Sequence, residues 1–142
     1  MNAIHIVYPA IAMFALSMGL LLTMGFKRYR AIQRGDVRIS FFSAYDKGSQ
    51  PERLHIWARH IQNHFEVPPL FYVAVVLLYS TNSVSLAAVV LAWLFVVSRC
   101  VHSYIHLGSN NVSRRFFTFG LGLLMVTALW TSLFIALVSN QG

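Results

Sequence analysis

Four long apolar segments dominate this chain of 142 residues. They lie at about residues 4–26, 56–79, 84–106 and 114–138, and each is long enough to cross a bilayer, which takes about 20 residues of α-helix. Hydrophobic residues make up 57% of the chain and charged residues only 11%, which excludes an ordinary soluble domain. The sequence therefore predicts one all-α domain over residues 1–142, folded as an integral membrane four-helix bundle.

The basic residues predict how this bundle is oriented. Most of the 11 lysines and arginines lie in or beside the first connection, residues 27–55, and Arg114 and Arg115 lie in the third. The turn at 80–83 and residues 139–142 carry no charged side chain. By the positive-inside rule the first and third connections are cytoplasmic, so both termini are non-cytoplasmic. The net charge of +7 is then a topology signal that suits contact with membrane lipid, and no nucleic acid partner is expected.

Two features of the backbone bear on a possible site. The cytoplasmic loop 27–55 is longer than a connection requires, and such loops usually cover a site. Pro68 and Pro69 remove two backbone donors inside the second apolar segment, so a kink is expected just after Glu66. Small residues that allow close helix approach are expected at Ala12, Ala15, Gly19 and Gly120.

The second apolar segment carries a polar face. Arg59, Asn63 and Glu66 are spaced at i, i+4 and i+7, so a helix presents a cation, an amide and an anion on one side. Glu66 is the only carboxylate in the apolar segments. A charge inside a membrane costs about 2.5 kcal/mol or more, so it is rarely kept without a partner or a function. This face is where a ligand is expected, and in so thin a bundle it favours a site between subunits.

The third apolar segment carries a matching polar stripe, Arg99, His102 and His106. At 1.5 Å per residue, Glu66 lies about 15 Å and Arg99 about 12 Å from the cytoplasmic ends of their helices. An isolated anion and an isolated cation thus reach similar depth on neighbouring helices. A structural ion pair between Glu66 and Arg99 is predicted, within or between subunits.

The histidines suggest an alternative chemistry. His60 with His64, and His102 with His106, form two i, i+4 pairs, a spacing that can hold a metal ion or bring ligands toward haem. No second acid or cysteine completes such a site, and both pairs are expected near the interface, where imidazole reaches water. No metal is therefore predicted, and a His-ligated metal or haem protein stays an alternative.

These motifs together resemble the superfamily of membrane-associated proteins in eicosanoid and glutathione metabolism, MAPEG, and a bacterial member similar to the microsomal glutathione transferases. The resemblance covers essentially the whole chain. Its second-helix motif, Arg-x3-Asn-x2-Glu with a following proline, is present as Arg59, Asn63, Glu66 and Pro68. Its third-helix pattern is present as Arg99, His102 and His106, and its fourth-helix arginine as Arg115.

The resemblance implies a homotrimer that holds glutathione as co-substrate between subunits near the cytoplasmic side. It implies that Arg59, Asn63 and Glu66 hold the tripeptide and that Arg115 is catalytic, stabilising the thiolate. His102 and His106 match ligand-contacting positions, although several eicosanoid-forming members have tyrosine at the latter. The first-helix arginine of the family corresponds to Arg28 or Arg30. Phe116 stands where the prostaglandin synthase branch has serine, which argues against that isomerase.

The chemistry of the residues agrees with this ligand. Glutathione has two carboxylates, one ammonium and one thiol, and this chain offers a basic cluster, one acid in an apolar segment and arginines at the start of the last span. We expect a glutathione-dependent enzyme of the bacterial inner membrane that conjugates or reduces a small apolar electrophile or lipid hydroperoxide, with its active site toward the cytoplasm. The second class is a non-catalytic membrane protein that binds lipid or a partner enzyme.

Overall fold

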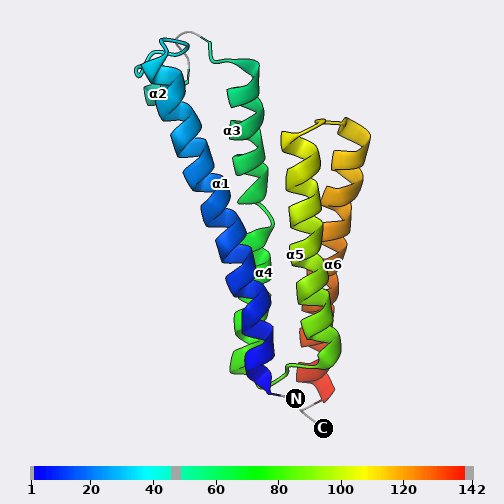
Figure 1. Ribbon diagram of the computed structural model, residues 1–142. Helices are drawn as coiled ribbons and strands as arrows, with labels where there is room; N and C mark the ends of the chain where they lie inside the picture. The colour runs from blue at the N-terminus through cyan, green and yellow to red at the C-terminus, as the bar shows by residue number, and fades with distance from the viewer. Residues whose placement is uncertain (1, 46–48, 140–142) are drawn as a thin grey trace.

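The computed structural model describes residues 2–45 and 49–139, and every regular element among them is helical (Figure 1). The elements are η1 (Ala3–Ile6), α1 (Val7–Gln33), α2 (Phe41–Ala44), α3 (Glu52–His64), α4 (Pro68–Ser80), α5 (Leu86–Leu107) and α6 (Val112–Ser139). Four helical stretches are long and apolar enough to span a membrane, with α3 and α4 together forming the second. The prediction of an all-α chain with four membrane-length helices is confirmed.

The first helix is longer than the sequence suggested. α1 continues through Lys27, Arg28 and Arg30 to Gln33, and α3 begins at Glu52, so the loop predicted at 27–55 is much shorter. Lysine and arginine are good helix formers, so the charged run extends the helix beyond its apolar part. The helix ends where Gly35 adopts φ 75°, and the N–H of Asp36 bonds to the carbonyl of Ala31 at 3.0 Å.

The second span is interrupted and not merely kinked. α3 ends at His64 and α4 begins at Pro68, with Phe65–Val67 outside both helices. Pro68 occupies the first turn of α4, where its missing N–H costs nothing. The kink predicted just after Glu66 is thus an interruption that begins before it, and it divides the span into a polar part, α3, and an apolar part, α4 (Figure 1).

The apolar core lies at the end of the bundle where α1 begins and α6 ends (Figure 1). Phe71 of α4 stacks on Phe95 of α5 with ring centroids 4.5 Å apart, and both are fully buried. The other fully buried apolar side chains of this cluster are Ile6, Met13, Ala74, Leu78, Ala88, Ala92 and Leu129. A smaller cluster near the loop holds Met24, Ala31, Val37, Phe41 and Leu54.

One close contact between α5 and α6 lies at a glycine that sequence reasoning missed. A Cβ on Gly122 of α6 would lie 3.1 Å from Ser98 Oγ and 3.5 Å from Arg99 Cδ of α5. Gly19 and Gly120, the glycines expected to serve this purpose, have open space around them within this chain. Gly122 thus sets how near α6 comes to α5 beside Arg99.

Candidate functional site

Four of the residues singled out from the sequence line one cavity of about 250 Å³. Asn63 comes from the end of α3, Glu66 from the interruption before α4, His102 from α5 and Arg115 from the first turns of α6. Val112, Phe116 and Phe119 complete the lining. An amide, a carboxylate, an imidazole and a guanidinium therefore meet over an apolar wall.

The interruption of the second span sets the position of Glu66. Because Pro68 and Pro69 cannot donate to the carbonyls of the preceding turn, the chain leaves the helix before Glu66 and the side chain is exposed. A carboxylate that faces open space can meet a ligand or a neighbouring chain. Asn63, half-buried one turn earlier, faces the same cavity.

The turn before α6 fixes Arg115. Asn111 caps the helix by accepting a bond from the N–H of Arg114 at 3.0 Å. Arg115 Nη1 donates to Asn110 Oδ1 at 2.9 Å and to His106 Nε2 at 3.2 Å. Arg115 is half-buried at a helix N-terminus, where free N–H groups and the helix dipole favour a bound anion.

Hydrogen bonding from Arg115 fixes the tautomers of two buried histidines. An arginine only donates, so His106 accepts at Nε2 and carries its proton on Nδ1. His106 Nδ1 then donates to His60 Nδ1 at 3.2 Å, which leaves the proton of His60 on Nε2. Both imidazoles are therefore neutral in this arrangement, and the chain of donors runs from α6 through α5 to α3.

The other two histidines are held in the same manner. His102 Nδ1 donates to the carbonyl of Arg115 and to Thr118 Oγ1, each at 3.2 Å. His64 Nε2 donates to Ser17 Oγ at 2.9 Å, because the Ser17 hydroxyl already donates to the carbonyl of Met13. All four histidines are 0–1% exposed, so the expectation that they reach water was wrong. α3 and α5 face each other through them and shield them.

One group of atoms in this cluster has the spacing of a metal site. The ligand nitrogens of His60, His102 and His106 lie within 4.8 Å of one another. Nε2 of His60 and Nε2 of His102 have no hydrogen-bond partner among the described residues. The arginines nearby oppose a cation, since Arg115 bonds directly to His106.

The ion pair expected between Glu66 and Arg99 is not formed within one chain. Arg99 is 0% exposed, and its Nε, Nη1 and Nη2 have no hydrogen-bond partner in the described part of the chain. Its guanidinium lies 5.6 Å from the ring centroid of Phe119. Glu66 is exposed and turns to the cavity instead. Pairing between neighbouring subunits stays a prediction.

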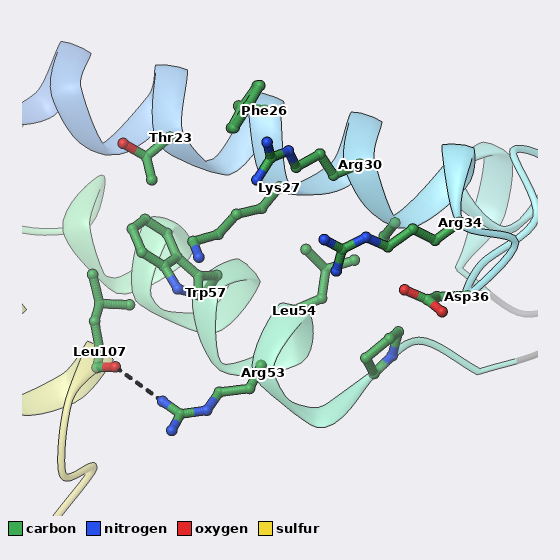
Figure 2. A pocket seen from close by; sticks show the side chains of 12 residues that line it. Thr23, Phe26, Lys27, Arg30, Arg34, Asp36, Arg53, Leu54, Trp57 and Leu107 are labelled. Carbon is green, nitrogen blue, oxygen red and sulfur yellow. Dashed lines mark hydrogen bonds between the residues drawn. The ribbon is translucent and has the colours of Figure 1, made fainter.

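The remaining basic candidates lie in separate cavities. Arg59 and Arg28 line one of about 360 Å³ together with Phe41, Tyr45 and Gln62. Arg30 lines another of about 570 Å³ between α1 and α3 (Figure 2). The structure thus separates Arg28 from Arg30, which the sequence left as equal alternatives.

Sequence reasoning missed three features of the network around Arg115. They are Asn110, Thr118 and the contact of His60 with His106. The two i, i+4 histidine pairs were the signal for the last of these, since a helix places both members of a pair on one face. Nothing in the sequence showed that the two faces meet.

A model of the MAPEG family matches residues 6–135, nearly the whole chain. The chain belongs to the MAPEG family. No curated protein and no solved structure gives a significant match. The family and the four apolar helices together make this an integral multi-pass membrane protein.

Membership of the MAPEG family also fits a glutathione-related or eicosanoid function in the membrane. The resemblance drawn from Arg59, Asn63, Glu66, Arg99 and Arg115 is confirmed at the level of the family. The roles of these residues stay predictions.

Proposed function

We propose that this protein is a glutathione-dependent membrane enzyme that activates the thiolate for conjugation to, or reduction of, an apolar electrophile or lipid hydroperoxide. The observation that supports this best is the cavity in which Asn63, Glu66, His102 and Arg115 meet. A carboxylate and an amide suit the ammonium and amide groups of the tripeptide, and a guanidinium suits its thiolate.

The cavity of one chain is small for this ligand. Its volume of about 250 Å³ lies below the roughly 300–1,000 Å³ usual for small-molecule sites. A second subunit that closes the open side would enlarge and complete it. Arg59 and Arg28, which share another cavity, supply cations for the glutathione carboxylates in this proposal. A homotrimer with sites between subunits satisfies both requirements.

Arg115 acts as an electrostatic group in this scheme. Its guanidinium stays protonated at any working pH, so it stabilises a thiolate without donating its own proton. The helix N-terminus adds to the effect, and both lower the pKa of a thiol placed beside them. Bonds to Asn110 and His106 hold the side chain in place before the ligand arrives.

The reaction proceeds from this thiolate. With an activated aryl halide, sulfur forms a bond to the electrophilic carbon and the halide leaves with its electron pair. With a lipid hydroperoxide, sulfur attacks the terminal oxygen, the O–O bond breaks to release an alcohol, and a second glutathione converts the sulfenic acid to disulfide and water. Val112, Phe116 and Phe119 give the cavity an apolar side for such acceptors.

Calorimetric titration of the detergent-purified protein with glutathione tests the proposal. The wild type binds, whereas Glu66→Gln and Asn63→Leu bind at least tenfold more weakly, since each substitution leaves a polar ligand group unpaired. Glu52→Gln, which removes a carboxylate at the start of α3 away from the cavity, is the matched control and binds normally. Equal affinity in all four proteins, or no binding by any, contradicts the proposal and favours the non-catalytic alternative.

The histidine spacing supports a second candidate, a metal centre at His60, His102 and His106. Metal analysis and cobalt absorption spectra test it, with His60→Phe as the variant and His55→Phe as the exposed control. Stoichiometric metal that is lost only in His60→Phe establishes the centre. Metal-free protein with full glutathione binding rules it out.

A further inference from the structure

A basic cavity of the described residues lies apart from the one proposed for glutathione, which we call the glutathione cavity. The basic cavity has a volume of about 570 Å³ and lies between the last turns of α1 and the first turns of α3, closed at one side by Leu107 of α5. Lys27 points from α1 toward Trp57 of α3, Arg30 and Arg34 extend along α1, and Arg53 of α3 points to the carbonyl of Leu107 (Figure 2). Asp36 is the only acid among the described residues that line this cavity, so the formal charges sum to +3.

Part of the lining of this cavity is apolar. Phe26, Leu54, Trp57 and Leu107 line it. Lys27 Nζ lies 5.0 Å from the ring of Trp57, and Arg30 lies 4.6 Å from the ring of Phe26. Aromatic rings that support cations in this way leave the outer donors of the cations free for an anion.

The cavity also sits at a boundary in the sequence. Phe26 ends the apolar part of α1 and Lys27 begins its basic part. Leu22 and Phe26 expose apolar surface on the membrane side of this boundary, at 68% and 55%. Lipid headgroups lie at such a boundary, with acyl chains along the apolar helix beneath them.

We propose that this cavity binds the phosphate headgroup of an anionic phospholipid. The cations hold the phosphate, the aromatic wall holds the glycerol, and the acyl chains follow α1 into the bilayer. An excess of three positive charges suits a headgroup with two phosphates better than one with a single phosphate. The lipid neutralises cations that otherwise repel one another between α1 and α3.

This cavity differs from the glutathione cavity in the chemistry it offers. It has four cations and one acid, and no amide side chain lines it. The acid, Asp36, follows the end of α1 at the rim. This lining therefore complements a phosphodiester with apolar chains better than it complements glutathione, which carries an ammonium group as well as carboxylates.

Native mass spectrometry of the delipidated protein tests the proposal through paired double variants. Arg34→Gln/Arg53→Gln removes two cavity cations, and Arg38→Gln/Arg114→Gln removes two exposed cations elsewhere. The wild type and the control bind phosphatidylglycerol and, more tightly, cardiolipin, but not phosphatidylcholine. The cavity variant binds about 25-fold more weakly, at about fivefold for each charge. Asp36→Asn, which removes the acid, binds about fivefold more tightly for the same reason.

Three results overturn the proposal. If the cavity variant and the control variant lose the same lipid affinity, the effect is one of net charge. If phosphatidylcholine binds as tightly as phosphatidylglycerol, headgroup charge has no role. Competition by glycerol phosphate as effective as that by the lipid assigns the site to a free phosphate. Unchanged glutathione titration of Arg34→Gln/Arg53→Gln shows that this site is separate from the proposed catalytic one.

A second measurement does not depend on the folding of a charge variant. Anionic lipid with brominated acyl chains quenches the tryptophan fluorescence of the wild type more than brominated phosphatidylcholine does. The excess quenching disappears in Trp57→Phe, because Trp93 and Trp130 lie far along α5 and α6 from this cavity. Excess quenching that survives in Trp57→Phe places the lipid elsewhere.

Discussion

The two ends of the bundle differ in the polarity of their buried side chains. At the end where α1 begins and α6 ends, apolar side chains from α1, α4, α5 and α6 fill the interior, with Phe71 stacked on Phe95. At the other end, past the interruption of the second span, the buried side chains include four histidines and Arg99, beside the smaller apolar cluster near the loop. Helices α1, α5 and α6 run through both ends.

This difference in polarity separates packing from ligand binding within a thin membrane bundle. The apolar end satisfies its backbone within helices and gains stability from packing alone. The polar end buries groups that each need a partner, and several have none among residues 2–45 and 49–139: Arg99, His60 Nε2 and His102 Nε2. A neighbouring subunit or a ligand is the source of the missing partners in our proposal, and the following predictions separate the two ends.

Phe95→Ala gives the largest expected effect at the apolar end. The side chain is fully buried against Phe71, so its removal leaves a cavity and costs about 4 kcal/mol. Thermal unfolding in detergent measures this, with Phe134→Ala, 67% exposed, as the control that changes little. Glutathione affinity stays unchanged in protein that remains folded, because the ring lies away from the cavity.

Arg99→Leu tests the polar end. If Glu66 of a neighbouring subunit pairs with Arg99 in the assembled protein, removal of the cation strands the anion and costs about 3 kcal/mol. The combination with Glu66→Gln then does less harm than the two separate losses added together. Strict additivity, or a gain in thermal stability from Arg99→Leu alone, is evidence against the pair.

Gly122→Ala tests the packing of α5 against α6 at the junction of the two ends. The added methyl would lie 3.1 Å from Ser98 Oγ, so Ser98, whose hydroxyl bonds to the carbonyl of Phe95, must shift by a few tenths of an ångström, at a cost of about 1–2 kcal/mol. Gly120→Ala, two residues earlier, meets open space and gains about 1 kcal/mol of helix propensity. Melting temperatures of the two variants therefore move in opposite directions, and a shift in the same direction contradicts this packing.

Ser17→Ala gives the smallest expected effect. It removes the acceptor of His64 and costs about 1 kcal/mol, the net value of one hydrogen bond. Thr23→Ala is the control, since its hydroxyl bonds only to the carbonyl of Gly19 in its own helix. Equal melting temperatures for both variants would mean that His64 finds another partner.

The sequence predicted what local patterns determine. Apolar length predicted the spans, and Pro68 predicted a kink where the structure has an interruption. Helical spacing predicted one face for Arg59, Asn63 and Glu66, but Asn63 and Glu66 line one cavity and Arg59 lines another. The sequence did not predict which faces of neighbouring helices pack together, because that depends on how each helix is rotated and on its register with its neighbour. The meeting of His60 with His106 and the choice of Gly122 over Gly120 are of this kind. The extension of α1 to Gln33 was missed because charge was taken as a sign of a loop.

The thiolate absorbance of bound glutathione, followed as a function of pH, tests the central claim most directly. In the wild type, thiolate forms at a pH well below that of free glutathione. The Arg115→Ala variant still binds glutathione, but its thiolate forms at higher pH. The shift is one pH unit for each loss of about 1.4 kcal/mol of thiolate stabilisation. Arg115→Lys falls between them, and Arg114→Ala behaves as the wild type. A wild-type pH profile in Arg115→Ala would contradict the account.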